Sequence, residues 1–248
     1  MSDRPISVDR SADLFAILRG GEARGLALAE TLWRYLPLVP RTLEVGVGAG
    51  VVAAAVGSDG RWVGGVDLSY TRLRRASRRL MGAAAQADAA ALPVAGGSVD
   101  AVYMVWLQLV PVGAVVAEAA RILRAGGRLV VVTGRYESGT GDEIGAIERR
   151  LDVVRPRDRP ADMTLRGTSA GLRLIERRDW IVALDQSPAE AATGLEARNL
   201  TTLWHLDRPK ERRVVAEVVA ALRSLPDHDR PRPRRLAYPL LVFEKPVG

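Results

Sequence analysis

The chain has 248 residues, of which two are histidine and none is cysteine. The lack of cysteine excludes disulfides, zinc–cysteine sites and thiol nucleophiles. The length suits one large α/β domain, or a core with a cap. The first residues lack an apolar signal core, and Pro111 interrupts the longest uncharged run, residues 101–117, so we expect a soluble cytoplasmic protein.

The net charge of +7 would suit a nucleic-acid partner. However, all basic residues except Lys210 and Lys245 are arginines. A surface selected to bind polyphosphate would normally use both residue types. We therefore attribute the arginine excess to genome composition and do not expect nucleic acid as the partner.

A glycine-rich turn is the most informative stretch of the sequence. Residues 10–36 read as two helical segments, and residues 42–45 then form a short apolar strand. Gly46, Gly48 and Gly50 follow it and precede the apolar run 51–56, which is typical of a helix. Because glycine has no Cβ and accepts positive φ, a ligand can approach the backbone of such a turn closely.

Glu44 indicates which ligand the turn takes. A dinucleotide fingerprint spaces its glycines G-x-G-x-x-G and leads a pyrophosphate to the helix, whereas this turn is G-x-G-x-G and follows an acid. A ligand with a cationic amino-acid end fits better. Residues 43–50, Leu-Glu-Val-Gly-Val-Gly-Ala-Gly, resemble the first motif of class I S-adenosylmethionine-dependent methyltransferases. The resemblance implies that Glu44 and the three glycines bind S-adenosylmethionine.

Asp67 ends a second predicted strand, residues 61–67, and precedes a predicted helix over 69–81. A carboxylate at this position can accept hydrogen bonds from both ribose hydroxyls of a nucleoside. Leu68 next to it is a further candidate for cofactor contact. The alternative is that Asp67 caps the following helix.

Residues 87–102 extend the resemblance. Asp88 and Ala89 stand where the family places an acid and its neighbour against the adenine, before a Leu-Pro turn and a fourth strand. Val99 stands where the family prefers phenylalanine. The junction at residues 121–129 is again similar to the family, so the match runs from about 41 to 133.

The fourth strand, residues 99–105, is nearly all apolar, as a buried parallel strand should be. Ligands of open α/β sheets bind at the carboxyl ends of strands, so we expect Met104 to contact the cofactor. Trp106 is a candidate for substrate binding or for packing. Gln108 is a candidate catalytic residue, near where relatives often carry histidine. The Asn/Asp-Pro-Pro-aromatic motif is absent, which argues against methylation of a nucleic-acid base.

The C-terminal part contains an insertion before the last strand, residues 236–244. Residues 187–190 form a capping box that starts one helix, and the valines of 214–222 mark another. We predict a single domain, with an N-terminal helical lid (1–40), a cofactor-binding core (41–183), a helical cap over the site (184–235) and a final strand (236–248).

The remaining candidates lie in the lid and the cap. Trp33 and Trp204 are substrate-binding candidates, although packing is the simpler interpretation of Trp33. His205 is a candidate general base or a structural histidine, and His228 lies in a charged loop. No carboxylate cluster suggests a metal.

These features together predict a Rossmann-like class I methyltransferase fold, a seven-stranded, mostly parallel sheet with helices on both faces and an antiparallel last strand. The predicted function is methyl transfer from S-adenosylmethionine to a hydroxyl, amine or carbon of a small metabolite. The alternatives are a methyltransferase-like protein that binds the cofactor without turnover, and an RNA-directed methyltransferase. No membrane partner is expected, and a homodimer is left open.

Overall fold

The computed structural model describes residues 21–36, 38, 41–81, 83–107, 112–133, 142–154, 159–196 and 209–247. The chain divides into two compact units. The first, the core unit, comprises Met1–Gly134, Asp158–Arg178 and Pro239–Gly248. The second, the accessory unit, comprises Arg135–Arg157 and Asp179–Tyr238. Among the described residues, no helix is long and apolar enough to cross a membrane.

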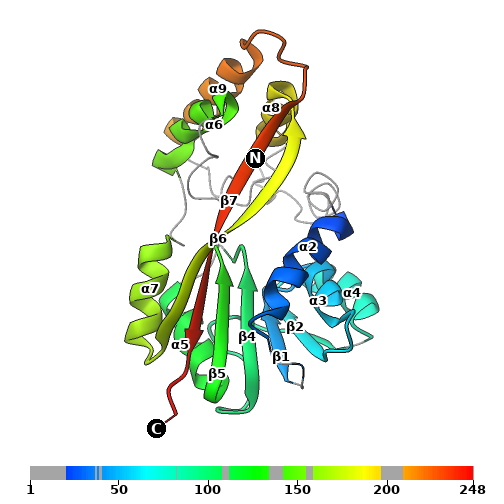
Figure 1. Cartoon of the computed structure of the whole chain (residues 1–248), viewed down its shortest axis with the longest axis vertical. Helices are drawn as coiled ribbons and strands as arrows, with labels where there is room; N and C mark the ends of the chain where they lie inside the picture. The colour runs from blue at the N-terminus through cyan, green and yellow to red at the C-terminus, as the bar shows by residue number, and fades with distance from the viewer. Residues whose placement is uncertain are drawn as a thin grey trace, which may run out of the picture. The chain divides into compact units, whose positions relative to one another are not determined.

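A seven-stranded sheet has the strand order β3-β2-β1-β4-β5-β7-β6. Its strands are β1 (Thr42–Val45), β2 (Val63–Asp67), β3 (Ala84–Gln86), β4 (Val99–Val105), β5 (Leu123–Val132), β6 (Arg173–Gln186) and β7 (Arg232–Glu244). The pairs among β1 to β5 are parallel, and β7 pairs antiparallel with β5 (Figure 1). The predicted fold class, with its antiparallel last strand, is confirmed.

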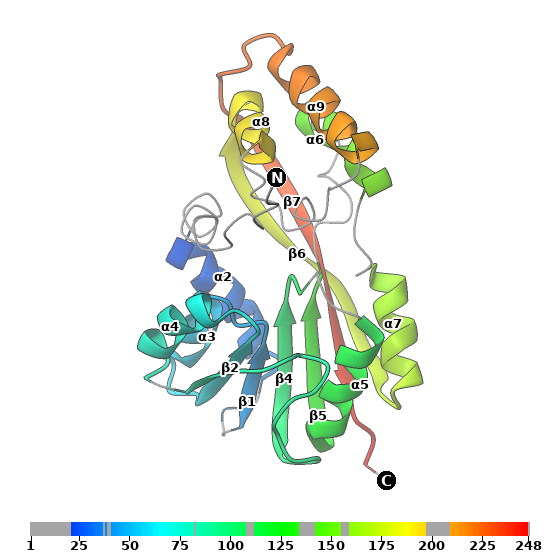
Figure 2. The ribbon, with the colours of Figure 1, turned by 180° about the vertical axis from the view of Figure 1, so that it is seen from behind.

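Helices cover both faces of the sheet in the core unit (Figures 1 and 2). On one face, α5 (Val112–Ile122) and α7 (Pro160–Ser169) share a buried apolar cluster with alternate strand residues, among them Val45, Val102 and Leu129. On the other face lie α2 (Gly21–Trp33), α3 (Val51–Gly57) and α4 (Tyr70–Arg79). This second face receives the side chains that alternate with the first set, including Glu44 and Tyr103.

Some elements differ from those that the sequence pattern indicates. β5 begins at Leu123, inside the junction at residues 121–129, because Leu123 pairs with Val99 before an irregularity in the register. β7 begins at Arg232, inside the stretch predicted as a charged loop. Helix α7 has no predicted counterpart, although Pro160 at its start and Asp162 in its first turn were usable signals.

The accessory unit has its own apolar core. It contains α6 (Glu143–Glu148), the 3-10 helix η1 (Arg149–Val154), α8 (Pro188–Glu196) and α9 (Pro209–Arg223). The buried apolar residues come from all four helices: Ile144, Leu151, Ala191, Ala192, Leu195, Val218, Val219 and Leu222. The predicted capping box is present, since Glu190 N–H donates to Ser187 Oγ and Ser187 N–H donates to Glu190 Oε2. This unit is larger than the predicted cap, because α6 and η1 join it.

A buried arginine lies within the accessory unit. The side chain of Arg234, on β7, is fully buried, and its guanidinium donates to Glu148 Oε2 at 2.9 Å and to Gln186 Oε1 at 2.6 Å. Its Nε lies 3.2 Å from Asp142 Oδ1, and Asp142 also caps α6 through the N–H of Gly145. The guanidinium thus links β7, β6 and the start of α6.

We expect Arg234→Ala to destabilise the accessory unit by about 3–5 kcal/mol, because it leaves the buried Glu148 carboxylate without its cation. Arg232 on the same strand is the matched control. Its partner Glu143 is 54% exposed, so Arg232→Ala should cost less than about 1 kcal/mol. Urea unfolding of both variants measures the difference. Equal losses would show that the buried network does not stabilise the unit.

Candidate functional site

The carboxyl ends of β1, β2, β3 and β4 lie at one edge of the sheet because these strands run parallel. The glycine-rich turn follows β1, Asp67 ends β2, Asp88 follows β3 and Trp106 follows β4. The structure therefore brings these predicted residues to one edge. This is the edge at which open α/β sheets bind their ligands.

All three glycines of the turn have positive φ, but a side chain at each of them would meet different surroundings. A Cβ at Gly46 (φ 78°) would lie 2.6 Å from Leu107 Cδ1, and a Cβ at Gly50 (φ 79°) would lie 2.9 Å from the Cα of Ala76 in α4. A Cβ at Gly48 (φ 55°) would meet nothing within 4 Å. Gly46 and Gly50 thus permit close packing, whereas Gly48 faces open space where a ligand can reach the backbone.

Asp67 holds the turn in place. Its Oδ2 accepts a hydrogen bond from Gly48 N–H and its Oδ1 accepts one from Ser69 N–H, both at 2.8 Å. The alternative prediction that Asp67 caps the next helix is wrong, because Ser69 is the N-cap of α4 and its side chain accepts from Arg72 N–H. Each carboxylate oxygen of Asp67 can accept a further hydrogen bond, which ribose hydroxyls could supply.

Glu44 is buried below the turn, with 2% of its surface exposed. The Tyr103 hydroxyl donates a hydrogen bond to Glu44 Oε2 at 3.0 Å, and the backbone of Ala53 in α3 also hydrogen bonds to the carboxyl. Burial raises the pKa of Glu44 to about 8, and the negative charge of Asp67 contributes to the increase. Tyr103 is a site residue that the sequence analysis missed; its polar group within an apolar strand was the available signal.

Of the two predicted adenine-side residues, Asp88 lies at the surface and Ala89 is buried. Asp88 is exposed, and its Oδ1 accepts a hydrogen bond from Ala90 N–H at 2.8 Å, which stabilises the turn after β3. Ala89 is 9% exposed and packs against the core, whereas Leu68 is 69% exposed. Asp88 and Leu68 are thus accessible to a ligand.

Met104 is placed differently from the other predicted cofactor residues. Its side chain is 2% exposed and joins the apolar cluster under α5. Met104 lines a small apolar pocket together with Leu107, Val112, Val115, Val116, Val131, Val132, Thr133 and Met163. Leu107, which also contacts Gly46, was not predicted as a site residue. A cofactor contact of Met104 stays a prediction.

Trp106 has φ +53°, which is a strained conformation for a bulky residue. The backbone N–H of Trp106 donates to Val132 O at 2.9 Å, and the residue is half-buried. Strained backbone of this kind clusters at functional sites. The conformation directs the chain sharply away from β4 at the edge where the other site residues gather.

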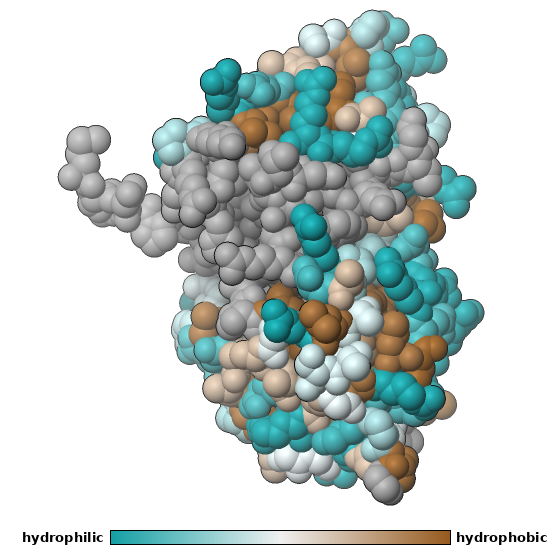
Figure 3. All heavy atoms as spheres, turned by 90° about the vertical axis from the view of Figure 1, so that its left-hand side faces the viewer, coloured by the Kyte–Doolittle hydropathy of each residue, from teal (hydrophilic) through white to brown (hydrophobic). Residues whose placement is uncertain are grey.

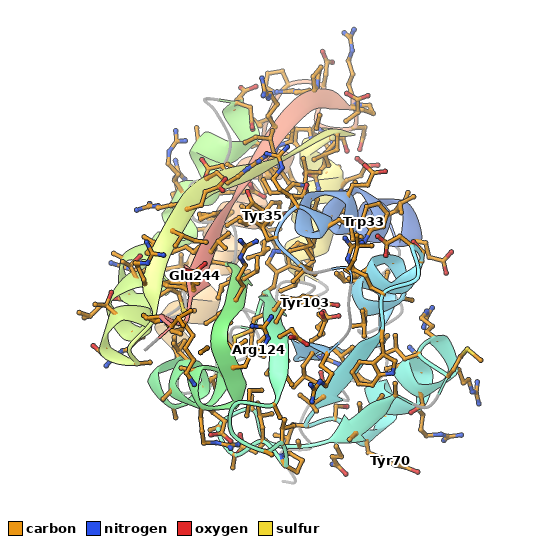
Figure 4. The ribbon with its side chains drawn as sticks, turned by 60° about the horizontal axis from the view of Figure 1, so that its bottom comes forward. Trp33, Tyr35, Tyr70, Tyr103, Arg124 and Glu244 are labelled. Atoms are coloured by element: carbon orange, nitrogen blue, oxygen red, sulfur yellow. The ribbon has the colours of Figure 1, made fainter. Side chains whose placement is uncertain are left out.

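Trp33 has the contacts of a packing residue (Figure 4). Its indole N–H donates to Val56 O at 3.0 Å, and the Arg61 guanidinium lies 5.8 Å from its ring centroid. These contacts join the end of α2 to the end of α3, so substrate contact by Trp33 stays a prediction.

Other candidates lie outside the site or outside the described residues. Gln108, Trp204 and His205 belong to the stretches that the structure does not describe. His228 lies near Asp229 in a turn of the accessory unit, with 43% of its side chain exposed. The described part of the chain contains no group of His, Asp and Glu that could hold a metal.

Comparison with known proteins bears on the same region. Residues 43–131 match the methyltransferase domain family. These residues form a class I, S-adenosylmethionine-dependent methyltransferase domain. The matched range contains the glycine-rich turn, Asp67 and Asp88, so the predicted family is confirmed. A comparison with curated proteins gave no match.

Solved structures share the fold of this chain. A candidate methyltransferase of Bacillus halodurans C-125 is 19% identical with a TM-score of 0.59, over 90% of this chain and 99% of that one. Phosphoethanolamine N-methyltransferase 2 of Haemonchus contortus is 19% identical with a TM-score of 0.58, over 97% of this chain and 58% of that one. Geranyl diphosphate C-methyltransferase of Streptomyces coelicolor is 19% identical with a TM-score of 0.54, over 88% of this chain and 78% of that one.

The glycines of the turn give a stability test. Both Gly50→Ala and Gly48→Ala put alanine at positive φ, which costs about 1–2 kcal/mol. Only Gly50→Ala also pushes a Cβ against the backbone of α4, so it should lower the free energy of unfolding by about 1–3 kcal/mol more than Gly48→Ala. Urea unfolding without ligand measures both. If both variants lost the same free energy of unfolding, α4 would have moved to make room for the added Cβ at position 50.

Proposed function

We propose that this methyltransferase transfers the methyl group of S-adenosylmethionine to a hydroxyl, amine or carbon of a small metabolite. The observation that carries the proposal is the open backbone at Gly48, held by Asp67 beside the accessible Asp88. This arrangement offers backbone and carboxylate groups to a nucleoside, and the acidic residues at the turn favour a cationic ligand over a pyrophosphate.

Methyl transfer requires the protein mainly to position the donor and the acceptor. In-line methyl transfer from a sulfonium needs proximity, alignment and exclusion of water, so a general base is optional. Trp106, at the strained end of β4, is the described residue best suited to contact an acceptor. Gln108, Trp204 and His205 remain proposed as substrate-side residues, with His205 as the candidate general base.

The RNA-directed alternative has less support. Many described arginines are paired with carboxylates, including Arg124 with Asp100, Arg173 with Glu244 and Arg223 with Glu196. On the face drawn in Figure 3, hydrophilic and apolar side chains are interspersed. Paired arginines offer less free charge to phosphates, which agrees with a compositional origin of the excess. Turnover of a small molecule without nucleic acid would separate the two functions.

Binding of the methyl donor tests the proposal directly. The chain should bind S-adenosylmethionine and S-adenosylhomocysteine, and Asp67→Ala should weaken binding by about 10- to 100-fold, because it removes charge-assisted hydrogen bonds worth about 1.5–3 kcal/mol. Asp162→Ala, in the first turn of α7, is the matched control and should bind like the parent. Calorimetry measures the affinities. Tighter binding of NADH than of either ligand would contradict the proposal.

The role of His205 needs a separate variant. If His205 is the general base, His205→Ala should lower the single-turnover rate by about 10²- to 10⁴-fold and remove a pH dependence near neutrality. His228→Ala is the matched control, because His228 lies in an exposed turn. A panel of small hydroxyl, amine and activated-carbon acceptors supplies the substrate. An unchanged rate with a lower melting temperature would show that His205 only packs. Donor binding without turnover of any acceptor would favour the non-catalytic alternative.

A further inference from the structure

Glu44 and Tyr103 form an enclosed polar pair in the core unit. They are register partners on β1 and β4, so their side chains leave the same face of the sheet. The register partner of Glu44 on β2 is Gly65, and a Cβ there would lie 2.6 Å from Val47 Cγ2. Neither Glu44 nor Tyr103 is more than 2% exposed. Bulk water therefore contributes little to the solvation of the Glu44 carboxyl.

The groups that act on Glu44 include no cation among the described residues. β4 contributes the Tyr103 hydroxyl, α3 contributes the backbone of Ala53, and β2 contributes the negatively charged Asp67. Helix α3, with the sequence VVAAAVG, has no titratable side chain. Burial raises the pKa of Tyr103 well above its usual value, so the phenol stays protonated and remains the donor.

We propose that Glu44 and Tyr103 couple binding of the methyl donor to release of a proton. In the ligand-free domain Glu44 holds a proton, and the positive ammonium and sulfonium of the arriving donor favour its carboxylate form. The O–H bond of Glu44 breaks and the proton passes to the solvent. Tyr103 is a positioning residue, because its hydroxyl holds the carboxylate through a charge-assisted hydrogen bond. This inference rests on the proposed function.

The sign of the pH dependence follows from the direction of release. Because burial raises the pKa of Glu44 to about 8 without ligand, most of the molecules carry the proton at pH 7. A process that releases protons becomes more favourable as pH rises. Donor affinity should therefore increase about ninefold from pH 6 to pH 7, by a smaller factor from pH 7 to pH 8, and level off at higher pH.

Calorimetry on the full chain tests the coupling. S-adenosylmethionine and S-adenosylhomocysteine are titrated at pH 7 in buffers of different ionisation enthalpy, and affinities are measured from pH 6 to 9. The parent should release a large part of one proton for each S-adenosylmethionine bound. Glu44→Gln should release almost none beyond what the ligand's own amine contributes. Release should be larger with S-adenosylmethionine, because only this ligand carries the sulfonium charge.

Tyr103→Phe separates positioning from packing. The Tyr103 hydrogen bond lowers the pKa of Glu44, so its removal should move the rise in affinity to higher pH. The variant should bind more weakly than the parent at pH 7, and the difference should narrow toward pH 9. Tyr35→Phe is the matched control, because the Tyr35 hydroxyl also donates to a carboxylate, Glu176 Oε1 at 2.6 Å, away from the turn (Figure 4). It should keep the pH profile of the parent.

The outcomes distinguish the two proposals. Donor binding by the parent without proton release and with flat pH dependence overturns the coupling and leaves the proposed function standing. A uniform loss of affinity at every pH in Tyr103→Phe overturns the role of Tyr103. Failure of the parent to bind either ligand overturns the proposed function and this inference with it. If Glu44→Gln does not fold, the pH profile of Tyr103→Phe still decides the matter.

Discussion

The positive φ at Gly46, Gly48 and Gly50 is the constraint on which the donor side of the core unit depends. Because the backbone turns this way, Gly46 lies against Leu107 after β4 and Gly50 lies against Ala76 in α4. The same turn directs the N–H of Gly48 to the carboxylate of Asp67 on β2. One short segment thus fixes the relative positions of β1, β2, β4 and α4, and it leaves open space beside the backbone of Gly48.

The sequence was sufficient to predict this side of the molecule, because the decisive features are local. The spacing of the glycines, the acid that ends β2 and the acid after β3 each follow a strand closely, and parallel strands bring their ends together. The direction of individual side chains was harder to predict. Met104 and Tyr103 are adjacent on a uniformly apolar strand, and without period-2 polarity the sequence does not show that Met104 faces α5 while Tyr103 faces Glu44.

The accessory unit shows a different limit. Its two longest helices were predictable from a capping box and a 3.6-residue period, but their partners α6 and η1 lie far away in the sequence. The unit is also organised around Arg234, which comes from a stretch of prolines and arginines that reads as a solvated loop. Arginine is rarely fully buried, so composition gives no sign of such a residue. The carboxylates that pair with it, Asp142 and Glu148, come from that same distant segment.

The burial of Glu44 is itself an argument about function. A carboxyl group at 2% exposure is unfavourable for folding compared with an apolar residue of similar volume, and the nearby negative charge of Asp67 opposes its ionisation. The strained φ of Trp106 lies at the same edge of the sheet. Unfavourable features gather at functional sites, where the structure around them holds them in place. A cationic ligand favours the carboxylate form of Glu44, whereas a phosphate would favour the protonated form, so the buried carboxyl group responds to the charge of the ligand that the turn takes.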